Sequence, residues 1–85
     1  MIVGTQFTGS IPPSSAKRWF TFAWPVSWHV LWTVLPTTPI LGAPEIDWDV
    51  AVERASATDL TYWITIWNLS SLPIDIEARY AIMNL

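Results

Sequence analysis

Seven tryptophans among 85 residues are the feature that most constrains how this chain can fold. They lie in segments where side chains alternate with a period of two, which is the pattern of β-strands. A single domain of this size buries only about 60% of the surface that its unfolded chain exposes. The interior is therefore too small for every indole ring, and we expect some of the rings to meet a ligand or a second copy of the chain.

Composition places the chain among the subunits of larger assemblies. Its length predicts one domain over residues 1–85. Hydrophobic residues make up 52% and charged residues only 13%, against a usual charged share of about 25%. Only four cations are present, Lys17, Arg18, Arg54 and Arg79, and the formal net charge is −3. This balance argues against nucleic-acid binding, which requires clustered basic residues.

The sequence disfavours both a protein held together by disulfides or thiolate-bound metal and a protein with a membrane-spanning helix. The chain has no cysteine, so it can form neither a disulfide nor a thiolate metal site, and nothing identifies a compartment. Residues 19–44 contain no Asp, Glu, Lys or Arg, but four prolines interrupt this stretch. Its Trp, Val and Thr content favours strands, so we expect no membrane-spanning helix.

Six segments alternate with period two, and turns rich in proline, glycine and serine separate them. The segments are Met1–Thr8, Lys17–Trp24, Trp28–Leu35, Glu45–Arg54, Leu60–Leu69 and Ile74–Met83. Six short strands predict an all-β chain that folds as a small antiparallel β-sandwich. The third segment is apolar on both faces, which predicts a central strand that is covered twice.

The alternation also predicts which side chains are buried. In the second segment we expect Phe20, Phe22 and Trp24 to face the interior, with Trp19 and Thr21 on the other side. The predicted core consists of Phe20, Phe22, Trp24, Val30, Trp32, Trp48, Val50, Val52, Ile64, Ile66, Ile74, Ile76, Tyr80 and Ile82.

Aromatic residues left outside this core are the candidate ligand-binding residues. Trp19, Trp63 and Trp67, with Thr65 between the last two, would form an exposed apolar surface. Indole rings can stack on the C–H face of a sugar, and they are also enriched in subunit interfaces. Trp63 and Trp67 lie about 13 Å apart along an extended strand, too far for one monosaccharide to contact both.

Catalytic chemistry is poorly represented in the sequence, and we expect no enzyme and no cofactor. His29 is the only histidine, and we expect it to be a hydrogen-bonded packing residue. Asp47 and Asp49 share a strand face at about 7 Å, a separation seen in glycosidases, but a flat strand offers no cleft.

Two other polar patterns have alternative interpretations. Glu45, Asp47, Asp49 and Glu53 form an acidic row, which we interpret as a solvated face rather than a calcium site. Asn68-Leu69-Ser70 matches the N-glycosylation acceptor pattern, but we expect Asn68 to stabilise the end of its strand and the following turn.

Several segments resemble the strands of the H-type lectin domain. They are Phe20–Thr33, with Trp28-His29-Val30-Leu31-Trp32 after a proline turn, then Ile46–Val52, Asp59–Ile66 and Asp75–Ile82. That family folds as a six-stranded antiparallel sandwich, assembles as a trimer and binds sugars related to N-acetylgalactosamine. This chain has Asp47 and Asp49 where the family tends to have arginine, and Leu69 where it has a late tryptophan. The resemblance therefore implies the fold and the trimer, but it transfers no binding residue.

Two functions follow from the sequence. The first is a non-catalytic, lectin-like carbohydrate-binding module that acts as a homo-oligomer, with a trimer favoured and repeated weak sites giving avidity. The alternative is a structural or assembly domain whose surplus tryptophans form subunit interfaces. A membrane-surface role is disfavoured because basic residues are few.

Overall fold

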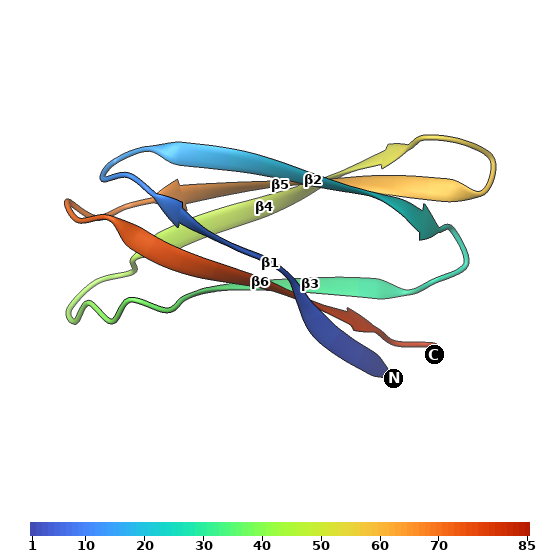
Figure 1. Ribbon diagram of the computed structural model, residues 1–85, viewed down its shortest axis with the longest axis horizontal. Helices are drawn as coiled ribbons and strands as arrows, with labels where there is room; N and C mark the ends of the chain where they lie inside the picture. The colour runs from blue at the N-terminus through green and yellow to red at the C-terminus, as the bar shows by residue number, and fades with distance from the viewer.

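The computed structural model describes all 85 residues and contains six β-strands and no helix (Figure 1). The strands are β1 (Ile2–Ile11), β2 (Ala16–Pro25), β3 (Val30–Pro36), β4 (Ile46–Arg54), β5 (Asp59–Asn68) and β6 (Ile74–Ile82). Each of the six predicted segments overlaps one of them. The prediction of an all-β, antiparallel chain is confirmed.

The strands form two three-stranded antiparallel sheets that pack face to face (Figure 1). Sheet A has the order β1-β6-β3, and sheet B has the order β2-β5-β4. Strand β3 therefore lies at an edge, and the prediction that it is central is wrong. The central strand of sheet A is β6, whose outward side chains Asp75, Glu77 and Arg79 are polar because that face of a three-stranded antiparallel sheet remains in water.

The core lies between the sheets and is built mainly from isoleucine. Ile11, Ile64, Ile66, Ile74 and Ile76 are almost completely buried. Of the predicted core residues, seven are buried: Trp24, Trp32, Ile64, Ile66, Ile74, Ile76 and Ile82. Another four are partly buried and pack against them: Val30, Trp48, Val50 and Tyr80. The predictions for Phe20, Phe22 and Val52 are wrong, because all three are exposed.

A β-bulge in β2 explains why the predicted facing of that strand fails. Thr21 pairs with Tyr62 and Trp24 pairs with Leu60, so Phe22 and Ala23 together occupy the space opposite one residue of β5. Ala23 has φ 64°, in the left-handed region. A bulge shifts the alternation by one residue, so the inward positions are Trp19 and Thr21 before it and Trp24 after it.

Trp24 is the centre of an aromatic cluster at one end of the core. Its ring meets Trp28, Trp32, Tyr62 and Tyr80 edge to face, with centroid distances between 5.3 and 6.1 Å. Its Nε1 donates a hydrogen bond of 3.0 Å to Thr21 Oγ1. Edge-to-face pairs add to the stabilisation that the buried area provides. Trp19 and Trp48 also pack against the core, so five of the seven tryptophans help to build the interior.

Asn68 stabilises the opposite end of the sandwich, where it is only 3% exposed. Its Nδ2 donates to the main-chain oxygens of Ile11 at 3.1 Å, Pro12 at 3.2 Å and Leu72 at 2.7 Å. Its Oδ1 accepts from the main-chain nitrogen of Ser70 at 2.9 Å and from the Ser70 hydroxyl at 2.8 Å. The predicted role of Asn68 in the strand end and turn is confirmed. Its amide nitrogen is committed to these bonds, which leaves no place for a glycan in the folded chain.

The structure contains no helix that is long and apolar enough to span a membrane.

Candidate functional site

The outer face of sheet B carries the aromatic residues that the core does not use. Alternation along β5 turns Tyr62, Ile64 and Ile66 into the core. Trp63, Thr65 and Trp67 therefore point outward, and the predicted facing of these three residues is confirmed. Trp67 is 38% exposed, whereas Trp63 is half-buried by its neighbours on the sheet.

Trp19 does not belong to this surface, and its predicted outward facing is wrong. Its ring stacks on Phe7 with a centroid distance of 5.0 Å and packs against the core. A Cβ on Gly9 would lie 2.7 Å from Trp19 Cζ2, so the ring fits beneath β1 only because residue 9 is glycine. Trp19 fills the space between the edges of the two sheets, on the other side of sheet B from Trp63 and Trp67.

Strand register arranges the outer face of sheet B in cross-strand rows. Residues that face each other in antiparallel strands have Cβ atoms about 5 Å apart. One row contains Phe20, Trp63 and Ala51, the next contains Arg18, Thr65 and Asp49, and the third contains Ala16, Trp67 and Asp47. Two aromatic rows therefore flank one polar row.

One end of this face is an aromatic patch formed by Phe20, Phe22 and Trp63. The Phe20 ring lies 5.1 Å from Trp63 and 6.2 Å from Phe22. Trp63 Nε1 donates a 2.9 Å hydrogen bond to Glu53 Oε1, and Arg18 Cζ lies 5.1 Å from the Trp63 ring centroid. Phe20 and Phe22 are 57% and 69% exposed. The patch is apolar and open, and the Trp63 ring is already engaged by its neighbours.

The polar row beside the aromatic patch consists of Arg18, Thr65 and Asp49. The only ion pair in the chain joins Glu77 to Arg79, so Arg18 and Asp49 are both unpaired. Thr65 lies between them, and their strands lie about 10 Å apart because each strand is spaced about 4.8 Å from the next. The row therefore presents donors and acceptors to solvent directly beside the exposed ring of Trp67.

Carboxylates on β4 do not converge. Asp47 Oδ1 accepts from the Trp48 main-chain nitrogen at 2.9 Å. Glu45 leaves the predicted row altogether, because its Oε1 accepts from the Ile40 main-chain nitrogen at 2.7 Å while Oε2 is buried. No group of three or more His, Cys, Asp or Glu side chains lies close enough to hold a metal ion.

His29 is exposed, so its predicted role as a packing residue is wrong. Strand β3 begins only at Val30, which leaves His29 in the preceding turn. Its main chain makes the contacts instead: the nitrogen donates to Asn84 Oδ1 at 2.9 Å, and the oxygen accepts from the Met83 nitrogen at 2.8 Å.

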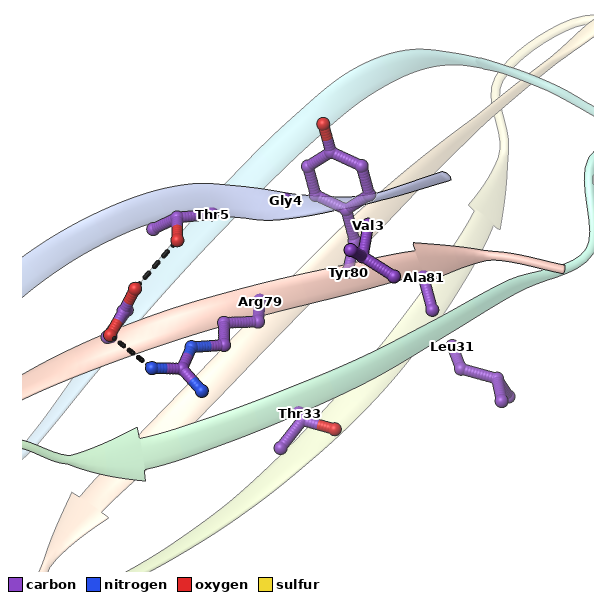
Figure 2. A pocket seen from close by; sticks show the side chains of 9 residues that line it. Val3, Gly4, Thr5, Leu31, Thr33, Arg79, Tyr80 and Ala81 are labelled. Atoms are coloured by element: carbon purple, nitrogen blue, oxygen red, sulfur yellow. Dashed lines mark hydrogen bonds and ion pairs between the residues drawn. The ribbon is translucent and has the colours of Figure 1, made fainter. Parts of the chain in front are cut away.

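A second surface, on the outer face of sheet A, is a shallow depression of about 650 Å³ (Figure 2). Its polar side consists of Thr5, Glu77 and Arg79. Thr5 Oγ1 donates to Glu77 Oε1 at 2.6 Å, and Arg79 Nη2 donates to Glu77 Oε2 at 2.9 Å. The remaining lining residues are Val3, Gly4, Leu31, Thr33, Tyr80 and Ala81. Sequence analysis missed this depression, although the outward facing of Glu77 and Arg79 on the last strand was a signal for its polar side.

Hydrogen bonds from Arg79 and Thr5 lower the pKa of Glu77. The bond from Arg79 is the larger cause, and the bond from Thr5 is the smaller. A depressed folded-state pKa stabilises the fold above the ordinary pKa of glutamate, and this stabilisation is lost as pH falls through the folded-state value. Replacing Arg79 by Met is expected to raise the pKa of Glu77 toward its ordinary value, measured by NMR titration of the side-chain carboxyl carbon. Thr5→Val should raise it less, and an unchanged pKa in Arg79→Met would contradict the assignment.

Comparisons with protein-family models, with curated proteins and with solved structures gave no match for this chain.

Proposed function

We propose that this chain is a non-catalytic, lectin-like carbohydrate-binding module that acts as a homo-oligomer and contacts sugar through the outer face of sheet B. One observation carries the proposal: the unpaired polar row of Arg18, Thr65 and Asp49 lies beside the exposed ring of Trp67. A sugar needs both elements, an apolar platform for its C–H face and directional groups for its hydroxyls.

The chemistry of the polar row suits a polyhydroxylated ligand. Arg18 supplies only donors, Asp49 supplies only acceptors, and the hydroxyl of Thr65 can do either. Hydrogen bonds to charged groups are about twice as strong as those between neutral groups. Because Arg18 and Asp49 flank Thr65 on either side, the row can bind hydroxyls that point in different directions from one ring.

Trp67 and Trp63 have different roles in this proposal. Trp67 is the stacking ring because part of its surface is free. The face of Trp63 is contacted by Phe20, and its indole nitrogen bonds Glu53. The contact of Arg18 with the Trp63 ring makes Trp63 a positioning residue for the guanidinium.

Two arguments support homo-oligomerisation. The six-stranded antiparallel sandwich is the architecture that the H-type lectin resemblance implies, and the same resemblance implies a trimer. A flat site with one exposed indole is expected to bind a single sugar weakly. Repeating such a site in an oligomer raises the overall affinity without any new contact.

The test is a glycan array followed by titration of the wild type with the best soluble monovalent sugar. Trp67→Ala is expected to weaken binding by about tenfold or more, the equivalent of about 1.4 kcal/mol. Phe22→Ala is the matched control, because Phe22 is also an exposed aromatic residue of sheet B but lies away from the polar row. A blank array, or equal affinity of Trp67→Ala and the wild type, would contradict the proposal.

A second candidate function is supported by the aromatic patch. Phe20 and Phe22 are more than half exposed on a flat face with no depression, which is typical of a surface that a protein partner covers. In this assembly function, the patch attaches the module to another subunit. Phe22→Ser would then reduce the mass of the native complex, while Trp67→Ala would leave it unchanged.

A further inference from the structure

Strand β3 combines the sequence of a covered strand with a position at the edge of a sheet. Val30–Pro36 contains no charged residue, and Leu31 on its outer face is 58% exposed. An edge strand without protection is a template for pairing with another chain. The sequence pattern of β3 therefore fits a strand that gains a neighbour when the protein assembles.

The other three edge strands carry features that discourage pairing. Strand β1 has a bulge between Thr5 and Phe7, and β2 has the bulge at Phe22 and Ala23. Strand β4 presents Asp47, Asp49 and Glu53 on its outer face. Bulges and charged side chains are the usual protections of natural sheet edges. Only β3 has neither, and its single proline, Pro36, is the last residue of the strand.

The main chain along the free side of β3 has no partner within the molecule. Residues 30–36 pair with β6 on one side only. The nine main-chain hydrogen bonds outside the strand ladders involve none of these residues. An antiparallel edge strand leaves every second residue with its N–H and C=O pointing outward. These groups are available to a second strand.

We propose that β3 of two copies pair antiparallel about a two-fold axis at Thr33, which joins the two A sheets into one sheet of six strands. This inference rests on the homo-oligomer of the proposed function and identifies one of its contacts. The pairing places Thr33 against Thr33, Leu31 against Leu35, Trp32 against Val34, and Val30 against Pro36. Each pair joins residues of the same face, so the inner and outer faces of both sheets continue across the contact.

A second copy is the occupant that these residues favour. On the outer face, the pairing brings leucine against leucine and threonine against threonine, both favourable cross-strand pairs. The same operation on β4, centred on Val50, would place Asp47 against Glu53 and is disfavoured by like charge. The carboxylates of β4 also point to the outer face of sheet B, away from β3. Self-pairing is therefore specific to β3.

A two-fold contact between copies of β3 requires an even number of chains in the assembly. If β3 makes the only contact, the protein is a dimer. If a trimer forms through another surface, the β3 contact joins two trimers, and the complete assembly has six copies. The number of chains is even in both cases.

Thr33→Glu separates the effect on the contact from the effect on the fold. Thr33 faces Arg79 in the register of β3 and β6, so a carboxylate at this position is tolerated in the single chain. At the two-fold axis, two carboxylates would face each other. Native mass spectrometry and sedimentation velocity are expected to show that the number of chains halves, from two to one or from six to three. Ala16→Glu adds the same charge to the exposed β2 edge and should leave the mass unchanged.

Several outcomes would overturn the inference: an odd number of chains in the wild type, a wild type that is monomeric over a wide concentration range, or Thr33→Glu at the wild-type mass. Hydrogen exchange provides an independent measurement, because the outward amides of β3 should exchange faster in Thr33→Glu than in the wild type. Binding of a monovalent sugar should be equal in both proteins. If the carbohydrate proposal fails, neither protein binds the sugar, and the mass measurements are unaffected.

Discussion

Asn68→Asp is expected to lower the free energy of unfolding by about 3 kcal/mol at neutral pH, one of the two largest effects of a single substitution in this chain. The change is nearly isosteric, but it replaces a donor by a carboxylate oxygen opposite the carbonyls of Ile11, Pro12 and Leu72. All three acceptors lose their partner, and the new charge is buried at a residue that is 3% exposed. Thermal and urea unfolding measure the loss.

The pH dependence of this loss distinguishes buried charge from a general packing defect. Carbonyl oxygens raise the pKa of a facing carboxyl group, so the folded-state pKa of the carboxyl group introduced by Asn68→Asp lies above its unfolded value of about 3.9. The variant is therefore most stable below that unfolded value, and it loses stability as pH rises through the folded-state pKa. A difference from the wild type that stays constant from about pH 3 to about pH 8 would contradict this explanation.

Asn84→Asp is the matched control for Asn68→Asp. Asn84 also bonds the main chain with both ends of its amide, since Oδ1 accepts from the His29 nitrogen and Nδ2 donates to the Ser27 oxygen. It is exposed, however, so water can replace the lost hydrogen bond. We expect a loss of less than about 1 kcal/mol.

Trp24→Ala is expected to lower the free energy of unfolding by about 3–5 kcal/mol. The substitution removes the ring that contacts Trp28, Trp32, Tyr62 and Tyr80, and these rings cannot fill the space. A loss of this size is a large part of the total stability of a small domain, about 5–15 kcal/mol. Urea unfolding followed by far-ultraviolet circular dichroism measures it without depending on tryptophan fluorescence.

Trp67→Ala provides the comparison for Trp24→Ala, because both remove an indole from a strand of sheet B. The Trp67 ring lies on the outer face and is partly exposed, so its loss leaves no cavity in the core. Equal losses of stability in the two variants would contradict the distinction between a core tryptophan and a surface tryptophan.

Alternation of side chains was sufficient to predict the six strands and the outward facing of Trp63, Thr65 and Trp67. It failed in β2 because a bulge changes the phase of the alternation without a clear signal in the sequence. Ala23 adopts a left-handed conformation that glycine or asparagine would have announced. One missed residue thus reversed the predicted facing of Trp19, Phe20 and Phe22.

Other parts of the site depend on pairings that a single strand does not encode. Thr5, Thr33 and Glu77 line one depression because β1 and β3 both pair with β6, although they are far apart in the sequence. Trp19 is accommodated because Gly9, on the other sheet, leaves space for its ring. The apolar character of β3 predicted coverage on both faces, but it could not show that the strand lies at an edge of the single chain.

The connections between the two sheets are concentrated at one end of the sandwich, and this affects how the sheets separate on heating. The turn between β1 and β2, the turn between β5 and β6 and the long loop between β3 and β4 all cross between the sheets at the end where Asn68 lies (Figure 1). At the other end, only the turn between β2 and β3 crosses. The two sheets are therefore held together more firmly at the end that contains Asn68 than at the other end. Thermal opening of the sheets should begin at the end that carries Trp24 and travel toward Asn68, the last point at which they separate.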